Sequence, residues 1–198
     1  IGERRTDITL LKEEVTYKNE YSFPSEPVSI ILSEKGWVRC LKGKVEDLKD
    51  LKFKDEDSLF LSIDANSNDK MIFFSSNGKA YSLDTVDLPS GRGHGTPLKI
   101  LLDIEEEHSI VNIFPFNSEK KYIVASSVGN GFIIKCHDML SNRKTGKQVV
   151  KIKENQKLIV CKKIEGESVV AIGKNKKMLI FPIDELPELS KGKGVRIQ

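Results

Sequence analysis

Three glycine-rich, basic segments are the residues of this sequence best suited to hold a charged ligand. They cover residues 90–96, 141–147 and 190–194. Glycine lets the backbone approach a ligand closely and leaves its N–H groups free. An arginine such as Arg92 can bind a phosphate through two parallel hydrogen bonds. One such segment is common in connecting loops, but three in one chain indicate a binding surface for a polyanion.

The remaining reactive side chains do not form a recognisable catalytic or metal site. The chain has three cysteines and three histidines: Cys40, Cys136, Cys161, His94, His108 and His137. Their spacing matches no zinc site and no disulfide framework. The nucleophile motif G-x-S-x-G and the phosphate-binding motif G-x-x-x-x-G-K-[ST] are both missing. We therefore expect no catalytic residue, no metal ligand and no cofactor in this chain.

The distribution of charge supports a polyanionic partner for the second half. Residues 1–107 contain 15 Lys/Arg and 21 Asp/Glu, a net of −6, whereas residues 108–198 contain 17 and 8, a net of +9. A strongly basic half is the electrostatic footprint of a nucleic-acid-binding protein. No apolar run reaches the roughly 20 residues that cross a bilayer, so we expect no membrane partner. The start lacks Met and an apolar signal core, which indicates a piece of a longer protein.

The elements that must position these segments follow a repeat. Four pairs of short strands with period-2 alternation flank turns that begin at Ser33, Ser75, Ser126 and Gly173, spaced by 42, 51 and 47 residues. Each pair predicts a hairpin. The hairpin strands are expected at 28–32 and 37–41, 71–74 and 79–83, 122–125 and 131–134, and 168–172 and 178–181. Further strands are expected at 58–63, 98–102, 110–116, 149–152 and 158–163.

A period of 40 to 50 residues with about four strands per unit predicts an all-β disc of blades around an axis. We expect a lead-in over residues 1–25 and a binding domain over 26–198. Its units would be about 26–65, 66–105, 106–155 and 156–198. Helix should be scarce, with at most one turn near residues 9–14.

Four segments resemble, in order, the C-terminal domain of the A subunit of bacterial DNA topoisomerase IV, a type IIA topoisomerase. Residues 26–43 are similar to its first blade, and residues 88–98 to its second-blade loop. Residues 181–194 look like the segment that closes a later blade, and residues 2–6 resemble the exit from the DNA-cleavage region. The likeness extends over nearly the whole chain.

The resemblance implies a β-pinwheel, a propeller-like disc of four-stranded blades that exchange strands. In topoisomerase IV the disc can be open or partial, and about four blades are expected here. The related A subunit of DNA gyrase carries a glutamine-arginine-glycine box after its first hairpin and wraps DNA with it. Here residues 43–53 lack that box. Topoisomerase IV is therefore favoured over gyrase, and strong wrapping is not expected.

The implied function is non-catalytic: the domain would bind and bend the transported duplex for decatenation, supercoil relaxation and chromosome segregation. The implied partners are double-stranded DNA, the cleavage domain of the same polypeptide, and the B subunit of the intact heterotetramer. Mg and ATP would be bound elsewhere in the intact enzyme, and the setting would be the bacterial cytoplasm, at the nucleoid. A propeller-type protein-interaction scaffold is the alternative, and a propeller enzyme with a site in its central channel is a weaker one.

The predicted DNA-binding residues are basic side chains in or near the loops and turns. Arg92, Lys191 and Lys193 lie in remnants that are similar to the gyrase box. The full set is Arg39, Lys42, Lys44, Arg92, His94, Lys135, Arg143, Lys144, Lys147, Lys174, Lys176, Lys177, Lys191 and Lys193.

Overall fold

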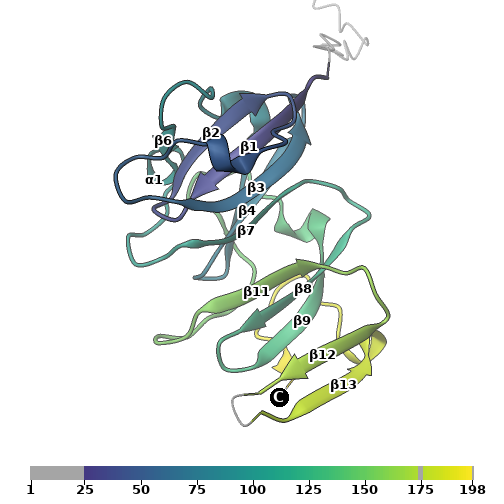
Figure 1. Ribbon diagram of the computed structural model, residues 1–198. Helices are drawn as coiled ribbons and strands as arrows, with labels where there is room; N and C mark the ends of the chain where they lie inside the picture. The colour runs from purple at the N-terminus through teal and green to yellow at the C-terminus, as the bar shows by residue number, and fades with distance from the viewer. Residues whose placement is uncertain (1–24, 174–175, 198) are drawn as a thin grey trace, which may run out of the picture.

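The computed structural model describes residues 25–173 and 176–197 and contains the four predicted hairpins (Figure 1). All four are antiparallel, with registers that place Ile30 opposite Cys40 and Phe73 opposite Tyr81. The hairpin strands are β1 Pro27–Ser33 and β2 Trp37–Lys42, β4 Lys70–Ser75 and β5 Lys79–Asp84, β8 Lys121–Ser126 and β9 Asn130–Lys135, and β12 Ser168–Ile172 and β13 Met178–Pro182.

Two further strands complete each of the first three hairpins, and one of the two comes from the next repeat. The third strands β3 Leu59–Asn66, β7 Ile110–Pro115 and β11 Leu158–Lys163 follow their own hairpins. The fourth strands β6 Thr96–Pro97, β10 Lys147–Gln148 and β14 Val195–Arg196 each follow the next hairpin. The sheet orders are β3-β1-β2-β6, β10-β5-β4-β7 and β11-β8-β9-β14, with β12-β13 as a two-stranded sheet. We call the complete sheets the first, second and third blades.

This topology confirms the all-β pinwheel with exchanged strands. Because each fourth strand is borrowed from the following repeat, the first blade extends from β1 to β6, across the boundary expected at residue 65. Figure 1 shows β1 and β12 at opposite ends of the molecule, so the blades of the described residues form an open disc.

The helical segments are short, and one of them replaces a predicted strand. Residues 98–102 were expected to be extended, but α1 spans Leu98–Leu101. Leu98 and Leu102, four residues apart, are 2% and 1% exposed, whereas Ile100 is 71% exposed. One helical turn therefore buries both leucines on one face. The other segments are 3-10 turns: η1 Leu48–Asp50, η2 Thr85–Asp87, η3 Cys136–Met139 and η4 Ile183–Glu185.

Two other expectations need correction or fall outside the described chain. Residues 149–152 form no regular strand, because the Val149 and Val150 amides both donate to the Gly78 carbonyl and only Val150 forms an isolated bridge. The helical turn expected at residues 9–14 lies outside the described residues.

The core lies between the blades, and each hairpin gives one face to each neighbour. Ile30 and Leu32 of the first blade share a buried cluster with Phe73 and Tyr81 of the second. The opposite face of the second blade, which includes Phe74, shares another cluster with the third blade, including Tyr122, Val124 and Phe132. Blades of this kind are stable only through their neighbours.

Strand order separates an inner edge from an outer rim. β7 contacts both β3 and β11, so the third strands lie side by side on the inner edge. The fourth strands occupy the opposite edge of each blade, which we call the rim. Within the described residues, no helix is long and apolar enough to cross a membrane.

Candidate nucleic-acid interface

The three glycine-rich segments occupy equivalent places on the rim. Residues 88–95 form rim loop 1 on the first blade, residues 140–146 rim loop 2 on the second, and residues 186–194 rim loop 3 on the third. Each loop hydrogen-bonds to the second hairpin strand of its blade. The Cys40 amide donates to the Pro89 carbonyl at 2.8 Å, and the Ile133 amide to the Pro187 carbonyl at 2.9 Å. In rim loop 2 the Ser141 amide donates to Ser82 Oγ at 3.0 Å.

One glycine closes each rim loop, immediately before the fourth strand. Gly95, Gly146 and Gly194 have φ of +91°, +72° and +77°. A Cβ would lie 2.3 Å from the Val38 carbonyl oxygen at Gly95 and 2.7 Å from the Tyr81 ring at Gly146. At Gly194 it would lie 2.3 Å from a backbone oxygen. These glycines therefore seat the loops on the blades, rather than letting a ligand approach as the sequence suggested.

A cation stands at the same position in every rim loop. Arg92, Arg143 and Lys191 each lie three residues before the closing glycine, and all three are exposed. His94, Lys144 and Lys193 lie beside them and are exposed as well. Within the described chain, none of these six side chains has a hydrogen-bond or ion-pair partner. The structure thus presents exposed cations at equivalent positions on three successive blades.

Several other predicted residues are already paired. Lys135 bonds Glu188 at 3.0 Å, and Lys121 bonds the same carboxylate. Glu188 raises the pKa of Lys135, while Lys121 and Lys135 hold the pKa of Glu188 below its usual value. Lys147 Nζ donates to the Asp138 carbonyl at 2.6 Å.

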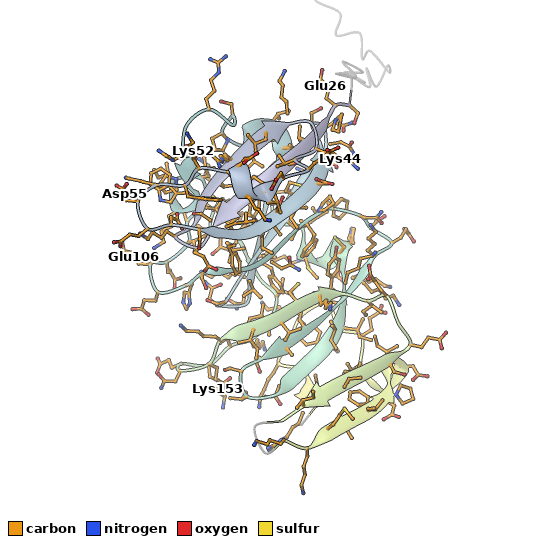
Figure 2. The ribbon with its side chains drawn as sticks, viewed as in Figure 1. Glu26, Lys44, Lys52, Asp55, Glu106 and Lys153 are labelled. Carbon is orange, nitrogen blue, oxygen red and sulfur yellow. The ribbon has the colours of Figure 1, made fainter. Side chains whose placement is uncertain are left out.

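Lys42 and Lys44 lie off the rim loops: Lys42 ends β2, and Lys44 lies in the segment that follows. Each is 3.9 Å from a carboxylate oxygen, of Glu26 and Asp64 respectively. Figure 2 shows Lys44 and Glu26 at the same end of the first blade. Exposed ion pairs at this distance contribute little to stability. The side chains of Lys42 and Lys44 are 93% and 69% exposed, so both remain accessible to solvent.

Arg39, one of the predicted DNA-binding residues, is buried in the structure and is not exposed on the rim. The residue is 7% exposed. Its two terminal nitrogens donate to the Gly93 carbonyl at 2.7 Å and to the Lys52 carbonyl at 3.0 Å. The guanidinium also lies 5.4 Å from the centre of the Phe53 ring. The cause is the alternation of β2, which points Arg39 toward the face that residues 43–57 cover.

The described basic residues at the turn of the last hairpin do not lie in a rim loop. Lys176 and Lys177 are exposed beside β13, and Lys176 has φ of +61°. Lys174 lies outside the described residues. Lys151, which the sequence did not single out, is exposed and donates its amide to the Gly192 carbonyl in rim loop 3 at 2.8 Å. The three lysines between residues 151 and 157 were the sequence feature that could have pointed to Lys151.

We also searched the described part of the chain for metal sites, reactive thiols and cavities. It contains no group of three or more His, Cys, Asp or Glu side chains placed to hold a metal ion. Burial raises the pKa of Cys40, Cys136 and Cys161, which keeps the three thiols protonated and weakly nucleophilic. A cavity of about 300 Å³ between the first and second blades is lined by apolar side chains such as Leu32 and Phe60, together with Lys35 and His108.

Comparison with known proteins shows which family has this fold. The model of the family described as "DNA gyrase C-terminal domain, beta-propeller" matches residues 69–117, 121–165 and 167–198. The chain belongs to this family. The three matches begin at or just before β4, β8 and β12, and the first hairpin lies outside them.

The curated relatives extend the likeness to the whole chain. The A subunit of DNA topoisomerase 4 from Caulobacter vibrioides is 43% identical over 173 residues, which are 87% of this chain and 23% of the relative. The protein of the same name from Escherichia coli is 35% identical over 199 residues, 99% of this chain and 26% of the relative. The chain thus spans about a quarter of these relatives. The expected kinship with the A subunit of topoisomerase IV is confirmed.

Solved structures agree on the fold. The C-terminal domain of E. coli ParC superposes with a TM-score of 0.81 at 35% identity, covering 87% of this chain and 71% of that one. A DNA gyrase A C-terminal domain superposes with a TM-score of 0.62 at 17% identity, covering 86% of this chain and 60% of that one. The second match supports the fold alone.

Proposed function

We propose that this chain is a non-catalytic DNA-binding domain, which binds and bends the transported duplex for a type IIA topoisomerase. The observation that carries the proposal is the equivalence of Arg92, Arg143 and Lys191 on successive blades of an open rim. A straight duplex cannot touch every blade of a curved rim. Contact with all three cations therefore requires the duplex to bend.

Phosphate contacts would dominate the affinity. Each neutralised phosphate releases counterions, so the logarithm of the binding constant falls with the logarithm of salt concentration by about 0.9 per contact. Any preference among sequences would arise from how easily the duplex bends, because rim cations on phosphates do not read bases.

The rest of the enzyme would supply the chemistry. We infer that the cleavage domain of the same polypeptide and the B subunit of the heterotetramer act on the bound duplex, with Mg and ATP bound there and no cofactor in this chain. The setting would be the bacterial cytoplasm, at the nucleoid.

The test is fluorescence anisotropy with labelled duplexes of about 15 and about 40 base pairs, titrated between about 50 and 200 mM salt. We expect tighter binding to the longer duplex and a steep salt dependence. Changing Arg92, Arg143 and Lys191 together to Glu should weaken binding at least tenfold, roughly one salt-sensitive contact per site. Equal binding of both lengths without salt dependence would contradict the proposal.

A matched control separates rim contacts from net charge. Lys49, Lys99 and Lys162 are exposed and lie off the rim, on η1, α1 and β11. Their joint change to Glu alters the net charge by the same amount. If this variant loses as much affinity as the rim variant, the rim loops are not the binding surface.

The protein-interaction scaffold remains a second candidate because of one surface. Val170, Ile172, Met178 and Ile180 share the outer face of β12-β13 and are 56–71% exposed. A protein bound there would be insensitive to salt and would not compete with DNA on the rim, so the same titrations distinguish the two functions.

A further inference from the structure

The face of the first blade that points away from the second blade is covered in an unusual way. In the second and third blades the corresponding face packs on the preceding blade, through Phe73 and Tyr81 in one and Val124 and Phe132 in the other. Within the described residues no blade precedes the first. Even so, Ile31 on that face is only 1% exposed.

Residues 43–57 provide the cover, and we call them the end segment. Ser29 Oγ accepts from the Val45 amide at 3.1 Å, and Lys35 Nζ donates to the Asp55 carbonyl at 2.9 Å. Lys54 Nζ lies 4.9 Å from the centre of the Trp37 ring. Figure 2 labels Lys52 and Asp55 on this segment, beside the first blade. The end segment thus takes the place of a preceding blade.

Arg39 lies where the end segment meets rim loop 1. It occupies the strand position of Tyr81 and Phe132, because Ile31 pairs with Arg39 as Phe73 pairs with Tyr81 and Val124 with Phe132. In the later blades this position packs against the glycine of a rim loop and against the preceding blade. In the first blade the Arg39 side chain also lies against the closing glycine Gly95, and its guanidinium bonds the Gly93 carbonyl of rim loop 1 and the Lys52 carbonyl of the end segment.

We propose that Arg39 is a positioning residue that fixes rim loop 1, and with it Arg92, by tying this loop to the end segment. A guanidinium suits the task because its planar fork donates in two directions at once, whereas an ammonium is a compact point charge. The link to Arg92 rests on the proposed function. The tie itself does not, because it consists of two hydrogen bonds within the chain.

Limited trypsin digestion tests the tie without DNA. Arg39→Met should speed cleavage after Arg92 and after Lys52 together, by about tenfold or more, because local opening exposes both sites. Cleavage after Lys144 should keep its rate, since rim loop 2 has no contact with Arg39. Arg39→Lys should lie between wild type and Arg39→Met.

Three results would overturn the proposal: no acceleration, acceleration at only one of the two sites, or equal acceleration at Lys144. The last would mark Arg39 as a residue of general stability. Phe53→Ala provides a second variant that leaves Arg39 in place. Because both hydrogen bonds of Arg39 remain in it, this variant should accelerate cleavage after Lys52 and Arg92 less than Arg39→Met does, and a larger acceleration would contradict the tie.

DNA titration then tests the consequence for the rim. Arg39→Met should weaken binding to a 40-base-pair duplex several-fold with Arg92 intact, and should add nothing in a chain that already carries Arg92→Met. An additive loss would overturn positioning through Arg92. If the wild-type chain binds no DNA, the proposed function fails, and the digestion result still decides the tie.

Discussion

At the scale of single residues, the surroundings of a charged group decide its role more than its sequence neighbours do. Arg39 and Arg92 both looked like phosphate ligands, but one is buried against two carbonyls and the other is exposed on the rim. Burial of Arg39 depends on the end segment folding back over β2. Its pairing with Gly93, 54 residues away, has no local signal.

Glu188 limits the positive charge available at rim loop 3. Its carboxylate holds Lys121 and Lys135. We expect Glu188→Gln to tighten DNA binding several-fold and to steepen the salt dependence, because two lysines become free to contact phosphates. The pKa of Glu188 is lowered, so both pairs persist at pH 7 and are lost only as pH falls through that lowered value. Anisotropy at pH 7 is the measurement, and an unchanged salt slope would contradict it.

Two glycines of the same backbone conformation separate packing from backbone strain. Gly146 and Gly93 have φ of +72° and +74°, but only at Gly146 would a Cβ meet the Tyr81 ring. Gly93→Ala should cost about 1–2 kcal/mol in the free energy of unfolding. Gly146→Ala should cost about 1–3 kcal/mol more. Urea denaturation of both variants measures the difference, and equal losses would refute the seating role of Gly146.

At the scale of elements, the local sequence pattern was sufficient to predict the hairpins but not the short strands. The four hairpins have alternating apolar residues around tight turns, which the sequence alone displays. β10 and β14 contain two residues each and exist only because a rim loop reaches a neighbouring blade. α1 was mistaken for a strand because Leu98, Ile100 and Leu102 alternate, although only the two leucines are buried.

The interior and outer faces of the hairpins provide a matched comparison. Ile72 on β4 is 0% exposed between two blades, and Ile172 on β12 is 71% exposed. Ile72→Ala should lower the free energy of unfolding by about 2–5 kcal/mol. Ile172→Ala should change it by less than about 0.5 kcal/mol. Thermal or urea unfolding compares the two, and a large loss at Ile172 would show that the outer face is covered in solution.

At the scale of the whole molecule, charge divides the open disc into unequal parts. The net of −6 in residues 1–107 includes the first blade's hairpin and end segment, and the net of +9 includes rim loops 2 and 3. DNA approaching the rim therefore meets the most favourable potential at the later blades.

This imbalance predicts unequal effects from equivalent substitutions. Lys191→Glu should weaken DNA binding more than Arg92→Glu, although both side chains occupy the same place in their loops. The difference should shrink as salt rises, because screening removes the longer-range contribution first. Anisotropy with each variant at about 50 and 200 mM salt decides it. A larger loss of affinity for Arg92→Glu would show that the first blade makes the stronger contact with DNA.

The exchange of fourth strands also determines the order in which the blades are completed during synthesis. The first blade gains its rim strand β6 only after the second hairpin has left the ribosome, and the third gains β14 only after the fourth hairpin. The rim edge of each newly made blade therefore stays unpaired until the next repeat has been synthesised. Domains fold from the N-terminus as they emerge, so the rim and its cations would be completed one repeat behind the growing chain.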